Sequence, residues 1–274
     1  MASGISEYSD DGTTSMMKRL MGGWPSHSGV MASLLAREGL TGLGTILEDK
    51  WGYCRTLAGE QEPRLEELTK GLGESFQILE REIKPYAAWG GSHLCIDAVN
   101  LLKREYHVQW QDIDKVVVLC ASRLYENRQI RPPQSIMAGQ MSMPFLTALA
   151  FVYDLRDPEV WGDEILSEPR VVELLDRVEC RIDDEIEKRW RAAGGQGEVK
   201  IIARLKTGME RSATIAYSKG TSENPLTDTE IWDKFRLLAG WRLPHARCER
   251  IADAVSRLEE IADVCELTEL VRTS

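Results

Sequence analysis

Hydrophobic and polar residues follow two different periods in the middle of the chain. Between residues 92 and 106, apolar residues such as Ile96 and Val99 recur at the spacing of a helix. The run of β-branched residues in 114–120 is typical of a buried strand. The strongly apolar segment 140–153 predicts a second helix, buried on most sides. The middle of the chain therefore mixes helices and strands.

Shorter segments complete this pattern. Strands are predicted from β-branched runs and from a hairpin that turns at Gly208: 76–83, 178–182, 198–205 and 210–217. Helices are predicted from apolar spacing and from cap residues: 27–38, 62–71, 171–176, 228–239, 245–261 and a short piece that ends near Val271.

The order of these elements predicts the fold class. Helices at both ends flank a region of mixed elements, which we expect to form an α+β domain with an antiparallel sheet over 75–218. The helices of 1–74 and 219–274 are expected to pack together as one helical layer. The α+β domain is then an insertion between the two parts of a helical domain.

Composition and charge narrow the classes of partner. The 274 residues include 34 Lys and Arg against 44 Asp and Glu, so the net charge is −10 with His neutral. Such a chain repels a phosphate backbone unless it has a concentrated basic face, and no run of Lys and Arg provides one. The longest apolar stretch, 144–153, is shorter than the about 20 residues of a membrane span. We expect neither nucleic acid nor a membrane as a partner.

Two further features concern the compartment and metal ions. Glu7, Asp10 and Asp11 stand near the N-terminus without an apolar stretch, so neither a secretory signal nor an Arg-rich transit peptide is expected. The six cysteines are scattered, with no C-x-x-C pair and no clustering with His at zinc-ligand spacing. We expect free thiols and no metal site in a cytoplasmic protein, with a mitochondrial location left open.

The first candidate site is a basic segment ahead of a helix. Lys18 and Arg19 stand just before a Gly-rich bend at 22–23, and the following helix is predicted to begin near His27. The backbone amides of the bend, a helix N-terminus and two cations suit a carboxylate ligand. The alternative, a solvated charge pair and a His at a helix N-terminus, stays open.

The second candidate site combines a lysine and a histidine. Lys84 ends a predicted strand, a Gly-rich loop follows, and His93 falls in the first turn of the next helix. A helix N-terminus lowers the pKa of a nearby imidazole, which keeps the ring neutral and available as a base. The alternative is a surface Lys and a capping His. Gln140 and Ser142 give another apolar helix a polar start, which a capped N-terminus explains equally well.

Taken in order, several segments resemble the MmgE/PrpD family, which includes 2-methylcitrate dehydratase and cis-aconitate decarboxylase. The matching segments are KRLMGGWPSHSG at 18–29, LLAREGLTG at 34–42, IKPYAAWGGSH at 83–93, SIMAGQMSMPF at 135–145 and NPLTD…KFRLLAG at 224–240. The resemblance covers essentially the whole chain in the family's order. Residues 135–145 and the PEVW at 158–161 are similar to the fungal cis-aconitate decarboxylases.

The resemblance implies an all-helical domain, to which the C-terminal helices return, plus a smaller α+β domain. It implies a cofactor-free lyase that acts on a small tricarboxylate at a site between the domains, usually as a homodimer. By position, Lys18, Lys84 and His93 match basic residues of that site and are the expected catalytic residues. Neighbouring polar residues are expected to bind the substrate: Arg19, His27, Gln140 and Ser142.

The chain also departs from the family pattern. Family members carry a long helical stretch before the position of Ala2, which supplies catalytic Asp and His residues. Trp89 stands where some decarboxylases have a His, and Phe145 replaces a common Tyr, which removes a hydroxyl. The resemblance therefore implies a partial helical domain with exposed apolar faces. It also implies a homodimer or a second chain that supplies the missing helical half.

Three functions follow as alternatives. The first is a lyase similar to cis-aconitate decarboxylase, and the second is a dehydratase of 2-methylcitrate or another alkylcitrate. The third is a truncated, non-catalytic homologue that binds or modulates a full-length relative.

Overall fold

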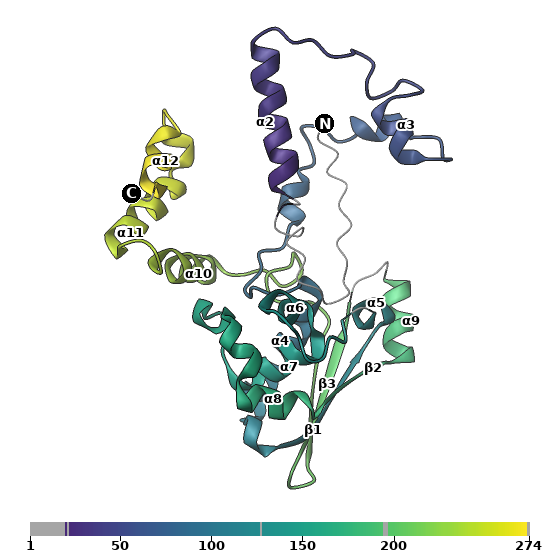
Figure 1. Cartoon of the computed structure of the whole chain (residues 1–274), viewed down its shortest axis with the longest axis vertical. Coiled ribbons are helices and arrows are strands. Elements are labelled where there is room, and N and C mark those ends of the chain that lie inside the picture. The colour runs from purple at the N-terminus through teal and green to yellow at the C-terminus, as the bar shows by residue number, and fades with distance from the viewer. Residues whose placement is uncertain (1–19, 21, 127, 194–196, 273–274) are drawn as a thin grey trace. The chain divides into compact units, whose positions relative to one another are not determined.

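The computed structural model describes residue 20 and residues 22–126, 128–193 and 197–272. The chain forms two compact units, which meet in sequence between Glu80 and Arg81. The first unit contains short helices and loops, and the second contains the sheet and the C-terminal helices (Figure 1). The predicted α+β class is confirmed.

The N-terminal unit is built around helix α2 (Gly23–Arg37). This helix contains most of the segment predicted over 27–38 and begins one turn earlier, because Pro25 is tolerated in a first turn. It ends just before Gly39, whose φ of 97° favours glycine. A second short helix, α3 (Tyr53–Ala58), follows in the same unit.

Two predictions for the end of this unit are wrong. Residues 76–83, predicted as a strand, contain a 3-10 turn over Gln77–Glu80. Within the described part of the chain no strand pairs with them, so nothing supplies the ladder of hydrogen bonds that a strand needs. The helix predicted over 62–71 shortens to a 3-10 turn at Leu65–Leu68, because this charged segment buries no apolar face that would support a longer helix.

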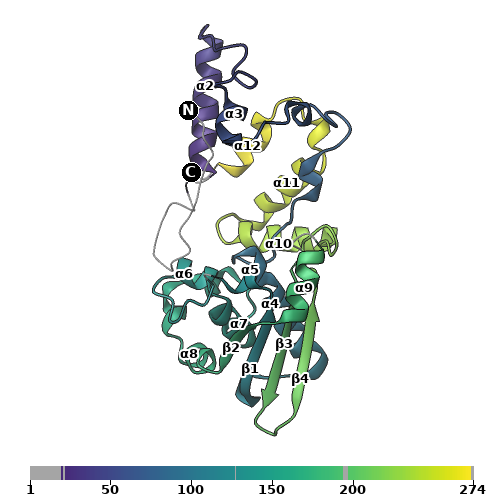
Figure 2. The same ribbon diagram turned by 90° about the vertical axis from the view of Figure 1, so that its right-hand side faces the viewer.

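Four strands form a sheet in the second unit, in the order β2-β1-β3-β4 (Figure 2). They are β1 (Ile113–Cys120), β2 (Val178–Ile182), β3 (Val199–Leu205) and β4 (Glu210–Ile215). The predicted hairpin of β3 and β4 is confirmed, and Gly208 at its turn has a φ of 84°. β1 pairs with β3 antiparallel but with β2 in parallel, so the sheet is mixed rather than antiparallel. The sequence between β1 and β2 forms helices, the crossover that parallel neighbours require.

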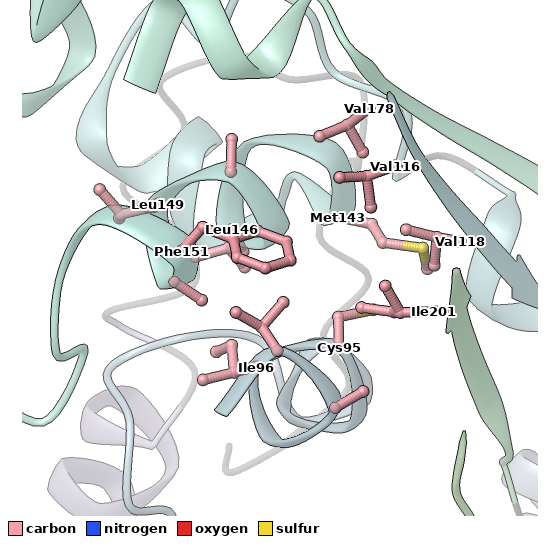
Figure 3. Packing of buried hydrophobic residues seen from close by; sticks show 14 of the residues in the cluster. Cys95, Ile96, Val116, Val118, Met143, Leu146, Leu149, Phe151, Val178 and Ile201 are labelled. Carbon is pink, nitrogen blue, oxygen red and sulfur yellow. The ribbon is translucent and has the colours of Figure 1, made fainter. Parts of the chain in front are cut away.

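One face of the sheet is covered by α4 (His93–Tyr106) and α7 (Met143–Val152), with α8 (Pro169–Leu175) packed against α7 (Figure 1). Alternate residues of β1 are buried, because successive side chains of a strand point to opposite faces. Figure 3 shows side chains that meet in this core: Cys95, Ile96, Val116, Val118, Met143, Leu146 and Ile201.

The apolar helix predicted over 140–153 is interrupted at Ser142. Helix α6 (Ile136–Met141) ends there and α7 begins, because Ser142 has an extended backbone and caps α7. Its Oγ accepts a hydrogen bond from the backbone N–H of Phe145 at 3.2 Å. Pro144 follows in the first turn, where a missing N–H costs nothing.

The remaining helices and turns lie before, between and after these layers. The other helices are α5 (Ser122–Tyr125), α9 (Asp184–Ala192), α10 (Asp228–Gly240), α11 (His245–Ser256) and α12 (Cys265–Val271). Further 3-10 turns are η3 (Gly90–Ser92), η4 (Trp110–Asp112), η5 (Pro158–Trp161), η6 (Asp163–Ser167) and η7 (Leu258–Glu260). The sequence did not predict α9, which is mostly charged and buries Ile186 alone. Its signal is the N-cap Asp183, which accepts two backbone hydrogen bonds.

The C-terminal helices lie in the same compact unit as the sheet. Thr227 and Glu230 form a capping box at the start of α10. Arg236 of α10 pairs with Glu249 of α11 at 2.8 Å. The assignment of the N- and C-terminal segments to one helical domain stays a prediction. In the described ranges, no helix has both the length and the apolar composition needed to cross a bilayer.

Candidate functional site

The loop that leads into α4 carries two of the predicted site residues, Lys84 and His93. Lys84 lies in irregular chain and does not end a strand, since the strand predicted before it is absent. His93 is the first residue of α4, as predicted. Ser92 holds the N-cap position, but its buried hydroxyl has no hydrogen-bond partner among the residues described here.

The imidazole of His93 is buried and uncharged. The residue is 1% exposed, and its Nε2 has no hydrogen-bond partner in the described chain. Burial lowers the pKa of His93 to about 4, and the nearby positive charge of Lys84 acts in the same direction. Hydrogen bonds to the backbone of Ala88 and Tyr86 oppose this shift without cancelling it. Near neutral pH the ring is therefore a neutral base with a free nitrogen.

The carbonyl of Ala88 joins the two predicted residues. Lys84 Nζ donates a hydrogen bond to this oxygen at 3.3 Å, and the ring of His93 also bonds to the backbone of Ala88. Lys84 is half-buried and has no carboxylate partner within the described residues. A second lysine, Lys234 of α10, also lowers the pKa of His93, and burial lowers its own pKa. The site therefore combines a free imidazole nitrogen with positive charge that no carboxylate of the described residues neutralises.

Trp89 connects this loop to α6. Its backbone N–H donates to the carbonyl oxygen of Gln140 at 2.9 Å, so Gln140, a predicted substrate-binding residue, lies at the same loop. Arg128, which is 2% exposed, places its guanidinium 4.3 Å from the centroid of the Trp89 ring. The backbone of Trp89 thus bonds to α6 while its indole packs against the Arg128 cation. An indole has no basic nitrogen, so it cannot take the role of the imidazole that some family decarboxylases have there.

Ser142, also predicted to bind substrate, uses its hydroxyl within the fold. Its Oγ donates to the carbonyl oxygen of Ile130 at 2.8 Å and accepts the capping hydrogen bond from Phe145. The side chain is fully buried. Its geometry therefore supports the capping alternative that the sequence left open.

The other predicted residues belong to the N-terminal segment. His27 is exposed on α2, where its ring stacks on Trp24 with centroids 5.7 Å apart. Lys18 and Arg19 lie outside the described residues. The structure thus joins Lys84 and His93 through Ala88, and it joins Gln140 to the next residue of the same loop, Trp89.

Sequence reasoning missed a polar network behind His93. Asp97 and Asn100 follow His93 by four and seven residues, so all three lie on one face of α4. Tyr86 donates its hydroxyl to Asp97 and accepts a hydrogen bond from Asn100. Three polar residues at helical spacing in the otherwise apolar stretch 93–102 are the signal that would have found them.

The donor set does not form a metal centre in the part of the chain that the structure describes. No group of three or more His, Cys, Asp or Glu side chains there is arranged to hold an ion. All six cysteines are free, and four of them are buried: Cys95, Cys120, Cys180 and Cys248. Burial raises the pKa of the Cys120 thiol to about 12 and that of Cys180 to about 11, so both stay protonated at neutral pH.

Comparison with known proteins places these features in one family. The chain is 28% identical over 269 residues to the cis-aconitate decarboxylase-like protein oryM of Aspergillus oryzae, which covers 93% of this chain and 55% of that protein. It is 27% identical over 271 residues to a cis-aconitate decarboxylase of Aspergillus terreus, with 93% and 54% covered. The chain thus spans about half the length of these relatives. The model of the MmgE/PrpD C-terminal domain matches residues 86–260, which is well over half of the chain. The protein therefore belongs to the MmgE/PrpD family.

Proposed function

We propose that this chain carries the carboxylate-binding and proton-transfer part of a lyase that acts on a small tricarboxylic acid, with an activity like that of cis-aconitate decarboxylase. One observation carries the proposal: the buried, neutral imidazole of His93 has a free Nε2 within the described chain and adjoins the ammonium of Lys84. A base nitrogen beside an unneutralised cation suits an anionic ligand that exchanges a proton.

Lys84 binds one carboxylate of the substrate in this proposal. A carboxylate oxygen is a stronger partner for its ammonium than the carbonyl of Ala88, because both groups then carry charge. Lys18 supplies a second cation, and Arg19 and His27 help to hold the remaining carboxylates. Gln140, which bonds to the loop through the backbone of Trp89, is proposed to offer its side-chain amide to the substrate. Ser142 remains a substrate-binding candidate from sequence alone.

In a decarboxylation, the bond between a substrate carbon and one carboxylate breaks, its electron pair stays on the carbon, and CO₂ leaves. That carbon then takes up a proton. Substrate carboxylates near His93 raise its pKa, because negative charge favours the imidazolium. His93 therefore takes a proton from solvent when substrate binds and delivers it from Nε2 to the carbon.

Dehydration of 2-methylcitrate or another alkylcitrate is the second candidate. In that reaction a base removes a proton from carbon and an acid protonates the leaving hydroxyl. The low pKa of His93 favours this alternative, because the ring is already a base before substrate binds. Lys84 holds a carboxylate in both reactions, so the two candidates differ in their product and not in these two residues.

The proposed active assembly includes further helices. The chain spans about half the length of its Aspergillus relatives, and its described residues before Arg81 expose most of their large apolar side chains. A chain that supplies the rest of the helical part, or the second copy of a homodimer, would cover such a surface. A chain that only binds or modulates a full-length relative would be the third, non-catalytic candidate.

An assay with two substrates separates these candidates. The purified chain is incubated with cis-aconitate or with 2-methylcitrate, alone and mixed with the separately expressed part of the Aspergillus terreus relative that this chain does not match. We expect loss of CO₂ from cis-aconitate in the mixture, detected by mass spectrometry. Loss of water from 2-methylcitrate would select the dehydratase. The absence of turnover in every sample would overturn the lyase proposal.

Variants then test the assigned residues. His93→Gln and Lys84→Met are each expected to lower turnover by about 100-fold or more, the usual contribution of a positioned acid–base or carboxylate-binding group. His245→Gln and Lys206→Met are matched controls, because both side chains are exposed, and they should preserve turnover. Turnover that survives both site variants would remove His93 and Lys84 from the mechanism.

A further inference from the structure

The carboxylate of Asp97 ties together three segments around His93. Tyr86 donates its hydroxyl to Asp97 Oδ1 at 2.7 Å, and the backbone N–H of Lys219 donates to Asp97 Oδ2 at 2.7 Å. Tyr86 lies in the loop before α4, Asp97 lies in α4, and Lys219 follows β4. Both carboxylate oxygens are therefore engaged, and the two donors come from opposite ends of the α+β region.

Both the hydroxyl and the ring of Tyr86 have partners in the fold. Its hydroxyl donates to Asp97 and accepts a hydrogen bond from Asn100 Nδ2 at 3.2 Å. Its ring meets the ring of His93 edge to face, with centroids 5.1 Å apart and an interplanar angle of 72°. A fixed ring in this contact limits rotation of the imidazole. Asp97 therefore acts on His93 through Tyr86.

The segment after β4 holds the other end of the loop. The backbone N–H of Ile83 donates to the carbonyl oxygen of Gly220 at 2.9 Å. Gly220 has a φ of 94°, and a Cβ at this position would collide with the carbonyl oxygen of Ile83, so only glycine fits. Lys84 thus lies between two anchored residues, Ile83 and Tyr86. Asp97 bonds to Tyr86 directly and to the residue before Gly220.

We propose that Asp97 is a positioning residue of the site, which orients the His93 imidazole through Tyr86 and fixes Lys84 through both ends of its loop. The effect on turnover rests on the proposed function, whereas the effect on the imidazole does not. Asp97 touches no ligand in this account. It keeps a base and a cation at a fixed separation before substrate arrives, which is how a preorganised site avoids the cost of ordering its groups.

Two variants remove the network at different points. Tyr86→Phe deletes the hydroxyl and keeps the ring, so the core loses only one oxygen atom. Asp97→Asn keeps the size of the side chain, but its NH₂ group faces a donor, so one of the two hydrogen bonds is lost. Tyr106→Phe is the matched control, because Tyr106 is half-exposed at the far end of α4. Circular dichroism checks that each variant folds.

The first readout is the pKa of His93, measured by NMR titration of the histidine-labelled full chain. We expect Tyr86→Phe to raise this pKa from about 4 by about one unit or more, because a released ring gains water and moves away from Lys84. Asp97→Asn should raise it less, because the loss of a nearby negative charge acts in the opposite direction. The second readout is kcat/KM for cis-aconitate, measured with the chain mixed with the part of the Aspergillus terreus relative. This value should fall by about 100-fold when reacting groups are misplaced. Tyr106→Phe should change neither value.

The two readouts keep the inference separate from the proposed function. Absence of turnover in the unmodified chain, together with a raised His93 pKa in the variants, would contradict the lyase and support the positioning role. Variants that only lower the midpoint of unfolding, while the His93 pKa and kcat/KM stay unchanged, would show that the network serves stability alone and would overturn the inference.

Discussion

The N-terminal unit and the α+β unit of this chain contain similar apolar residues, but these residues are exposed in the first unit and buried in the second. Phe145 and Leu146 of α7 are 1% and 0% exposed, whereas Leu43 and Leu79 in the N-terminal unit are 74% and 80% exposed. Among the described residues before Arg81, only Gly52 is buried. Apolar periodicity thus predicts which face of an element seeks a partner, and the rest of the fold decides whether one is present.

This difference also separates what stabilises each unit. Burying a large apolar side chain contributes roughly 1.5–3 kcal/mol, and the α+β unit collects this contribution at many positions. Helix α2 buries none of its residues, so it depends on its own backbone hydrogen bonds, which support a short helix only marginally. We therefore expect the two units to respond very differently to the same kind of substitution.

The largest expected effect is on the core. Phe145→Ala should lower the free energy of unfolding by about 3–5 kcal/mol, because it removes a buried ring and leaves a cavity. Leu79→Ala, at an exposed position, should change it by less than about 0.5 kcal/mol. Urea unfolding of the full chain, followed by circular dichroism, compares the two. Similar losses for both variants would contradict the contrast between the units.

The second effect is a dependence of stability on pH. Because folding lowers the pKa of His93 from 6.5 to about 4, the unfolded chain binds this proton first as the pH falls. The stability from the neutral ring is complete above pH 6.5 and is lost as the pH falls toward 4, by on the order of 3 kcal/mol. Urea unfolding across this range should show the loss in His245→Gln but not in His93→Gln. Parallel curves for these two variants would refute a buried neutral His93.

A smaller effect is expected at Ser142. Ser142→Ala should lower the free energy of unfolding by about 1–2 kcal/mol, because the hydroxyl caps α7 and bonds to Ile130. KM for cis-aconitate in the mixed assay should change less than about twofold, and Ser212→Ala, at an exposed position of β4, serves as control. A raised KM with unchanged stability would instead support the substrate-binding role that the sequence suggested.

The smallest expected effect is at His27. His27→Ala should leave the stability of the isolated chain unchanged within about 0.5 kcal/mol, because the side chain is exposed on α2. In the mixed assay, the proposed carboxylate contact predicts that this variant raises KM. An unchanged KM there would remove His27 from the proposed site.

The sequence predicted the elements whose signals are local. The helical spacing of Ile96 and Val99, the β-branched run of β1 and the turn at Gly208 all lie within one element or one hairpin, and the structure confirms each. The parallel pairing of β1 with β2 was missed, because it depends on residues far apart in sequence. The sequence indicated a capped N-terminus near Ser142, but the break there was missed, because the apolar residues on both sides of Ser142 have the pattern of one continuous helix.

In the site, too, the features that depend on local sequence were predicted and those that depend on long-range packing were not. The place of His93 at the start of a helix is a local property, and the sequence predicted it. The sequence also predicted a lowered pKa, but from the helix N-terminus, whereas burial is its main cause in the structure. Its depth of burial depends on how the loop, α4 and the segment after β4 meet, which no local pattern specifies. The bonds of Asp97 to Tyr86 and Lys219 belong to the same long-range arrangement. The helical spacing of the polar residues is present in the sequence, but their bonding partners became visible only in the folded chain.

The most direct test of this account is an NMR titration of His93 in the full chain, without ligand and with saturating cis-aconitate. The chain has four histidines, and the spectrum of His93→Gln identifies the signal. The account predicts a pKa of about 4 without ligand and a higher pKa when the carboxylates of the ligand lie beside the ring. A ligand-free pKa near 6.5 that cis-aconitate does not change would contradict it.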